Sequence, residues 1–97
     1  MNIKQEDLVR FWTWCGFDAH AFPQEFSLDL IYQYAVPRLQ DKGYSITLIA
    51  YERNEFGAGI FDEVHDVSMT EINRCDSPTE ALFNAIMKVI ENEQSNK

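Results

Sequence analysis

The hydrophobic period of this chain changes within residues 27–52, and no other feature restricts the possible folds as strongly. In the first part of this stretch, apolar side chains recur at helical spacing and share one side of a 3.6-residue wheel. They are Leu28, Ile31, Tyr32, Ala35 and Leu39. Ser27 is a favourable N-cap and Gly43 is a favourable residue just past a helix end, so a helix is predicted between them.

Pro37 lies inside this predicted helix. It has no N–H to donate, and its ring crowds the carbonyl of Gln33. We therefore expect a kink between residues 33 and 37 rather than a straight helix.

From residue 44 the period is two, as in a strand with an apolar and a mixed side. Ile46, Leu48 and Ala50 point to the apolar side, and Ser45, Thr47, Ile49 and Tyr51 point to the mixed side. Because only a short turn joins the helix to this strand, we expect the two to pack against each other.

Residues 2–15 are predicted to form a first helix, with Asn2 and Gln5 as a weak capping box and Gly16 as its stop. Its inward stripe is Leu8, Phe11, Trp12 and Cys15. Trp14 falls off that stripe. The simpler interpretation is that Trp14 packs under the following loop, and the alternative is an aromatic anchor for a partner.

Residues 18–26 have no sustained period and contain Pro23, so they are interpreted as a loop. The loop and its borders are rich in aromatic residues, which indicates that it lies against the domain. Phe22 of this loop, together with Trp14 and Tyr51, is a candidate for contact with a partner.

The second half of the chain is predicted to be a β-meander followed by a helix. Strands are expected at 56–62 and 67–74, with turns at 52–55 and 62–66. Gly57 and Gly59 indicate a bulge or a close backbone approach. Residues 76–93 show a full capping signal, with Ser77 at the N-cap, Pro78 at the first position and Glu80 at the third.

These elements predict an α+β fold of order α-α-β-β-β-α, a three-stranded antiparallel meander with helices packed on one or both faces. The length of 97 residues is enough for a single core. One domain is therefore expected over residues 1–91, followed by a frayed polar tail at 92–97.

The charge of the chain restricts its partners. Eight basic residues stand against 16 acidic ones, a formal net charge of −8 that repels phosphate backbones and acidic membranes. The predicted element order is also that of double-stranded-RNA-binding domains, but those use lysines where the final helix here begins with Pro78, Thr79 and Glu80. Since no apolar run would span a membrane and the first residues resemble no signal peptide, a cytoplasmic protein without nucleic-acid or membrane partners is expected.

Titratable groups are dense only at the predicted turn, where Asp62, Glu63, His65 and Asp66 lie close together. Contiguous charge at a turn usually means solvation, and Cys15 with His20 has no recognisable ligand spacing. No catalytic, cofactor-binding or metal-binding residue is therefore assigned, and no enzyme activity or cofactor is expected.

Three segments resemble the small phage and prophage proteins of the phage ABA sandwich domain family. They are residues 11–17 as FWTWCGF, 34–44 as YAVPRLQDKGY and 76–86 as DSPTEALFNAI. The resemblance implies a sheet with helices on both faces, which here would place the helix of residues 2–15 on the mixed side of the strand. It also implies a mobile-element product working in a bacterial cell, and it transfers no site residue.

The preferred hypothesis is a small acidic accessory protein of phage or prophage type, a non-enzymatic module that binds a bacterial or phage protein. The alternative is weak binding of a small ligand or divalent metal at the 62–66 turn. Self-association through the mixed sheet side or an open sheet edge is compatible with either.

Overall fold

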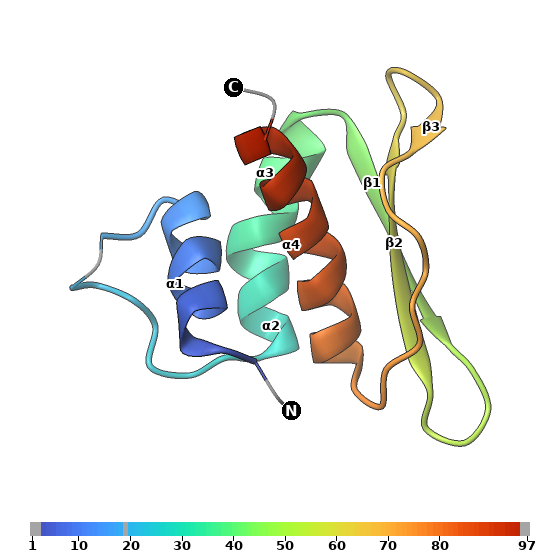
Figure 1. Ribbon diagram of the computed structural model, residues 1–97, viewed down its shortest axis with the longest axis horizontal. Coiled ribbons are helices and arrows are strands. Elements are labelled where there is room, and N and C mark those ends of the chain that lie inside the picture. Colours follow the sequence, from blue (N-terminus) through green and yellow to red (C-terminus); the bar gives the residue numbers. More distant parts are fainter. Residues whose placement is uncertain (1–2, 19, 96–97) are drawn as a thin grey trace.

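The computed structural model describes residues 3–18 and 20–95, and the predicted α+β fold of order α-α-β-β-β-α is confirmed. Helix α1 (Gln5–Trp14) is followed by a helical run of α2 (Leu28–Leu30), η1 (Ile31–Ala35) and α3 (Val36–Asp41). The strands β1 (Tyr44–Ala50), β2 (Phe56–Asp62) and β3 (Val67–Ser68) precede α4 (Pro78–Ser95). Figure 1 shows these elements in sequence colours.

The interruption predicted before Pro37 is present as a turn of π-helix, η1. Because Pro37 has no N–H to donate to the Gln33 carbonyl, the regular α-helical ladder cannot continue through this position. A wider turn accommodates the gap, and Val36 N–H instead bonds to the Ile31 carbonyl. The helical run begins where predicted, since the Ser27 hydroxyl accepts a hydrogen bond from Leu30 N–H at 3.3 Å.

The sheet is an antiparallel meander in the order β1-β2-β3. β1 and β2 pair along their whole length, with Ile46 opposite Ile60 and Leu48 opposite Ala58. All four side chains lie on the side that packs against the core. The predicted division of β1 into an apolar and a mixed side is therefore correct.

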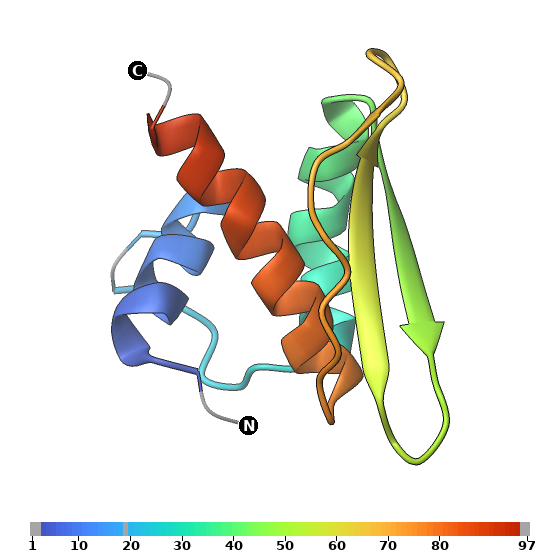
Figure 2. The ribbon, with the colours of Figure 1, turned by 45° about the vertical axis from the view of Figure 1, so that its right-hand side comes forward.

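All the described helices lie on one side of this sheet. α3 and α4 contact the strands directly, whereas α1 packs on α4. Figures 1 and 2 show the resulting layers, with α1 on the far side of the other helices from the sheet. The expectation that the first helix covers the mixed side of β1 is therefore wrong, because that helix finds its apolar partners on α4 and on the 18–26 loop instead.

Aromatic rings explain where α1 docks. Phe11 and Trp12 are buried, and Phe11 contacts Phe26 at a centroid distance of 5.7 Å and Phe83 of α4 at 5.2 Å. Trp12 also meets Phe17 edge to face at 5.4 Å. Such edge-to-face pairs add to the free energy of area burial. Phe17 and Phe26, at the two borders of the predicted loop, are therefore packed against the helices, as the aromatic composition indicates.

The ends of the outer helices differ from the sequence expectation. α1 begins after Lys4, which makes no capping hydrogen bond through its side chain, and the predicted cap Asn2 lies outside the described residues. α4 begins as predicted, with Glu80 N–H bonded to the Ser77 hydroxyl at 3.4 Å, but it continues to Ser95. Contacts to α1 hold this last turn, since Arg10 Nη2 donates to Gln94 Oε1 at 2.8 Å.

The third strand is much shorter than residues 67–74. Met69 N–H still bonds to the Ile60 carbonyl at 2.8 Å, but the regular pairing with β2 ends there, because the Thr70 hydroxyl takes the place of a backbone acceptor and accepts from Ile60 N–H at 3.1 Å. The chain returns at Cys75, which exchanges two backbone hydrogen bonds with Phe56. Between these points runs a segment of residues 69–74, which we call the strap.

Candidate interaction surface

The mixed side of the β1–β2 hairpin is its open side, because no described helix packs on it. It carries Thr47, which is exposed, and Ile49 and Phe61, which are half-buried. The surface therefore combines apolar and hydroxyl side chains on a regular two-stranded base.

The strap crosses part of the open side. A Cβ atom on Gly57 would lie 2.7 Å from Cγ2 of Ile72, and a Cβ atom on Gly59 would lie 3.3 Å from its Cγ1. The register of β1 with β2 is continuous at both glycines, so the predicted bulge is not present there, and the close approach is made mainly by the side chain of Ile72 rather than by backbone. Ile72 itself is 47% exposed, so it extends the apolar surface rather than closing it.

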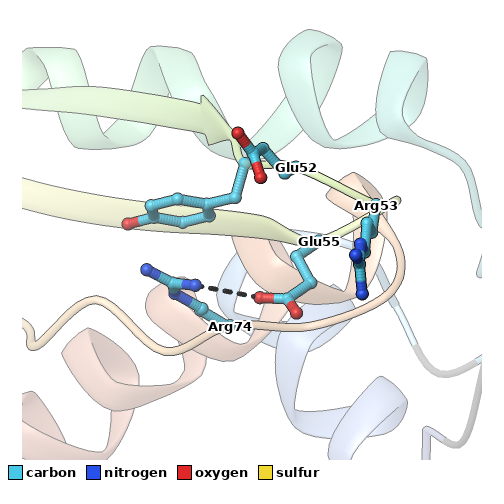
Figure 3. Close-up of a pocket in the computed structure, with 5 residues that line it drawn as sticks. Glu52, Arg53, Glu55 and Arg74 are labelled. Atoms are coloured by element: carbon cyan, nitrogen blue, oxygen red, sulfur yellow. Dashed lines mark hydrogen bonds and ion pairs between the residues drawn. The ribbon is translucent and has the colours of Figure 1, made fainter.

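A shallow hollow of about 460 Å³ lies at the hairpin end of the open side. Figure 3 shows its lining, which is Tyr51, Glu52, Arg53, Glu55 and Arg74. The hairpin turn builds one wall: Arg53 and Asn54 have positive φ angles of 58° and 60°, and Tyr51 N–H bonds to the Glu55 carbonyl at 2.7 Å. Two residues of positive φ suit the right-handed twist of a tight hairpin.

Arg74 organises the hollow. The bridge between Phe56 and Cys75 brings the end of the strap beside the hairpin, where the Arg74 Cζ lies 4.0 Å from the centroid of the Tyr51 ring. Its Nη1 donates to Glu55 Oε2 at 3.1 Å. The two side chains are 62% and 46% exposed, so this ion pair is worth at most about 1 kcal/mol. The hollow therefore offers charged and aromatic contact groups.

Of the three predicted contact residues, only Tyr51 lies in this surface. Trp14 is half-buried among helices: its Nε1 donates to Glu93 Oε2 at 3.0 Å, and Arg38 lies 5.3 Å from its ring centroid. Phe22 lines a separate hollow of about 290 Å³ between α1 and the loop, together with Trp12 and Phe26. Both therefore contact other parts of the chain in the structure.

The contacts of Trp14 belong to an ionic cluster that joins three helices. Glu93 Oε1 lies 2.7 Å from Lys42 Nζ. Burial would raise the pKa of Glu93, but hydrogen bonds from Lys42 and Trp14 and the charges of Lys42 and Arg38 outweigh it and hold this pKa below its ordinary value. Trp14 would have to give up this arrangement to anchor a partner.

The acidic turn at 62–66 has a structural explanation. Asp62 Oδ1 accepts from the N–H groups of Val64 and His65, each at 3.0 Å, and Oδ2 lies 2.7 Å from His65 Nδ1. Burial would raise the pKa of Asp62, but these bonds and the charge of His65 lower it. The carboxylate closes its own turn, so little of it is left for a ligand.

The thiol of Cys15 is the other sequence candidate for chemistry. Burial raises the pKa of the Cys15 thiol to about 12, against a smaller lowering by Arg38, so the thiolate form is scarce at neutral pH. Within residues 3–18 and 20–95, no group of three or more His, Cys, Asp or Glu side chains is placed to hold a metal ion.

Arg74 and Ile72 are among the residues of this surface that were not singled out from the sequence. Ile72 could have been anticipated from the pair of glycines, since Gly57 and Gly59 leave space that a neighbouring side chain fills. No comparable sequence signal points to Arg74, because its contact with Tyr51 depends on where the strap returns to the sheet.

No family model, no curated protein and no solved structure matches the chain. Among the described residues, no helix is long and apolar enough to cross a membrane. The fold and the surface define a small acidic α+β protein with one open sheet side.

Proposed function

We propose that this chain is a non-enzymatic protein-interaction module that contacts its partner through the open side of the sheet. One observation carries the proposal: the β1–β2 hairpin presents half-buried apolar side chains on a side that no described helix covers. Exposed apolar surface on a regular scaffold is typical of contact sites. The hollow at its end adds Tyr51 and Arg74, residue types that are enriched where binding energy concentrates.

The partner we propose is a bacterial or phage protein, met in the cytoplasm of the bacterial cell. This part of the proposal rests on the resemblance of three segments to the phage ABA sandwich family and on the net charge of −8. That charge favours a partner with a basic or neutral surface over nucleic acid. Binding of a small ligand or metal at the 62–66 turn is not supported by a specific observation, since Asp62 is already bonded within the turn.

The test is affinity capture from bacterial lysate with the wild-type chain and two tyrosine variants. Tyr51→Ser changes the open side, whereas Tyr32→Ser changes an exposed tyrosine, 45% accessible, on the helical layer. We expect a specific protein to be recovered by the wild type and by Tyr32→Ser, and to be lost at least about tenfold with Tyr51→Ser.

Circular dichroism of both variants checks that they are folded. Equal recovery by the two variants would place the contact elsewhere, and recovery of nothing above background under several conditions would contradict the proposal.

A further inference from the structure

Among residues 3–18 and 20–95, no strand pairs with the outer edge of β1. The strand order places β1 at the edge of the sheet, and Figure 2 shows it as the outermost strand. Two hydrogen bonds set the phase of its pairing with β2: Tyr51 N–H to the Glu55 carbonyl at 2.7 Å and Glu63 N–H to the Gly43 carbonyl at 2.9 Å. Antiparallel ladders alternate, so odd-numbered residues of β1 bond to β2 and the even-numbered ones face outward.

The backbone N–H and C=O groups that face outward belong to four residues, Tyr44, Ile46, Leu48 and Ala50. Among the described residues, no hydrogen bond to another element engages them. Edge strands usually carry a charge, a proline or a bulge that discourages pairing. None of these features is present within Tyr44–Ala50, whose sequence is YSITLIA and whose register with β2 is continuous.

We propose that this edge pairs with the same edge of a second copy of the chain, antiparallel about a two-fold axis at Thr47. This proposal rests on the proposed function in one respect, since both treat the sheet as a contact surface. It adds which molecule occupies the edge of the sheet. In this register Tyr44 faces Ala50 of the second copy and Ile46 faces its Leu48, so all four outward residues are paired. About eight backbone hydrogen bonds form, and a shift of two residues in either direction leaves about six.

Side chains agree with this register. Along the axis Thr47 meets its own copy, a pairing that strands favour, and Ser45 meets Ile49. No charged residue lies between Tyr44 and Ala50, so no like charges oppose each other there.

The pairing joins the three-stranded sheets of the two copies into one six-stranded sheet. A seven-residue edge alone buries less than the roughly 1,600 Å² of a standard interface, so we expect a dimer that dissociates on dilution. The net charge of −8 on each copy opposes association, and added salt should therefore tighten the dimer.

The decisive measurement is residue-resolved amide hydrogen exchange of the full chain over a series of concentrations. The N–H groups of residues 45, 47 and 49 are bonded to β2 and should be protected at every concentration. The N–H groups of residues 46, 48 and 50 should exchange fast in dilute solution and become protected as the concentration rises, in parallel with the mass from sedimentation velocity.

A matched pair of variants at Thr47 tests whether the two-fold axis lies at this residue. Thr47→Lys brings two positive charges together at the two-fold and should raise the dissociation constant about tenfold or more. Thr47→Val keeps the β-branched shape and should leave it within about twofold. Thr47 is exposed, so neither change removes a core contact.

A chain that stays monomeric up to about millimolar concentration overturns the dimer, and Tyr51-dependent capture of another protein would still stand. A dimer that Ile72→Ser abolishes while residues 46, 48 and 50 remain unprotected overturns edge pairing in favour of stacking through the open side. Because the exchange pattern is read on the wild type, a variant that fails to fold leaves the test intact.

Discussion

The two sides of the β1–β2 hairpin are built from the same strands and similar side chains, yet only one is buried. On the covered side Ile60 is 1% exposed beneath α4. On the open side Ile49 and Phe61 are only half-buried, and Thr47 is exposed. The comparison shows that the alternation within a strand sets which residues share a side, but the placement of the helices decides which side becomes core.

The choice between the sides follows from what the helices offer. α4 presents a row of buried aliphatic side chains, Leu82, Ala85, Ile86, Val89 and Ile90. α1 instead carries Phe11 and Trp12, whose rings fit against Phe26 and Phe83. Once these aromatic contacts are made, no helix is left among the described elements to cover the open side.

Truncation of one isoleucine on each side of the hairpin should give the largest difference in stability between the two sides. Ile60→Ala removes a fully packed side chain and should lower the free energy of unfolding by about 3 kcal/mol. Ile49→Ala on the open side should lower it by about 1 kcal/mol or less, because the site is in partial contact with water. Urea unfolding at low protein concentration measures both, and equal losses would mean that the open side is covered in solution.

The next largest effect on stability is expected at the contact between the strap and the open side. Gly57→Ala places a methyl group 2.7 Å from Ile72 Cγ2 and 3.0 Å from Tyr51 Cε2, and should cost about 1–2 kcal/mol. Gly59→Ala is the matched control and should cost less, since its added methyl group lies 3.3 Å from Ile72 Cγ1 and close to no aromatic ring.

A double-mutant cycle isolates the cause of that loss. In an Ile72→Ala background the penalty of Gly57→Ala should fall by at least about 0.5 kcal/mol. An unchanged penalty would mean that the alanine acts through the backbone or Tyr51 rather than through the strap.

The smallest change in the free energy of unfolding at neutral pH is expected from Asp62→Asn, at the end of the covered side. Asparagine keeps the shape of the side chain and one acceptor oxygen. The pKa of Asp62 is held below its ordinary value of 3.8 in the folded chain, so the carboxylate adds stability that is fully present above that value. This stability is lost as the pH falls through 3.8 and then through the lower folded pKa. The variant should therefore lose less stability than the wild type between pH 7 and pH 3.

Asp66→Asn is the matched control, because Asp66 lies in the same turn with a positive φ of 55° that asparagine also tolerates. Thermal unfolding over the pH range compares the three chains. A wild-type acid dependence retained in Asp62→Asn would contradict the assigned role of this carboxylate.

Much of the fold could be read from local signals. The π-helical turn sits where Pro37 removes a donor, β2 has the predicted bounds, and the Ser77 cap starts α4 as expected. These features depend on neighbours within a few residues, and local stereochemistry decides them. The third strand failed as a prediction because its end is set by Thr70, whose hydroxyl replaces a backbone acceptor on β2.

The surface was less predictable than the fold. Tyr51 lines the hollow of the open side, but Arg74 reaches it only through the bridge at Cys75, and Trp14 is held by Glu93 from the other end of the chain. Contacts between residues so far apart in sequence leave no periodic trace along the chain.

By itself the sequence determined the α+β class, the meander, the alternation of its strands and the capped final helix, because each is a local preference summed over a short window. Only the tertiary structure decided which side of the sheet stays open. Both sides of β1 carry apolar residues, and burial depends on which helix has the better complementary surface elsewhere. That choice is made by long-range packing, since the aromatic rings of α1 are matched by Phe26 and Phe83 rather than by the strand.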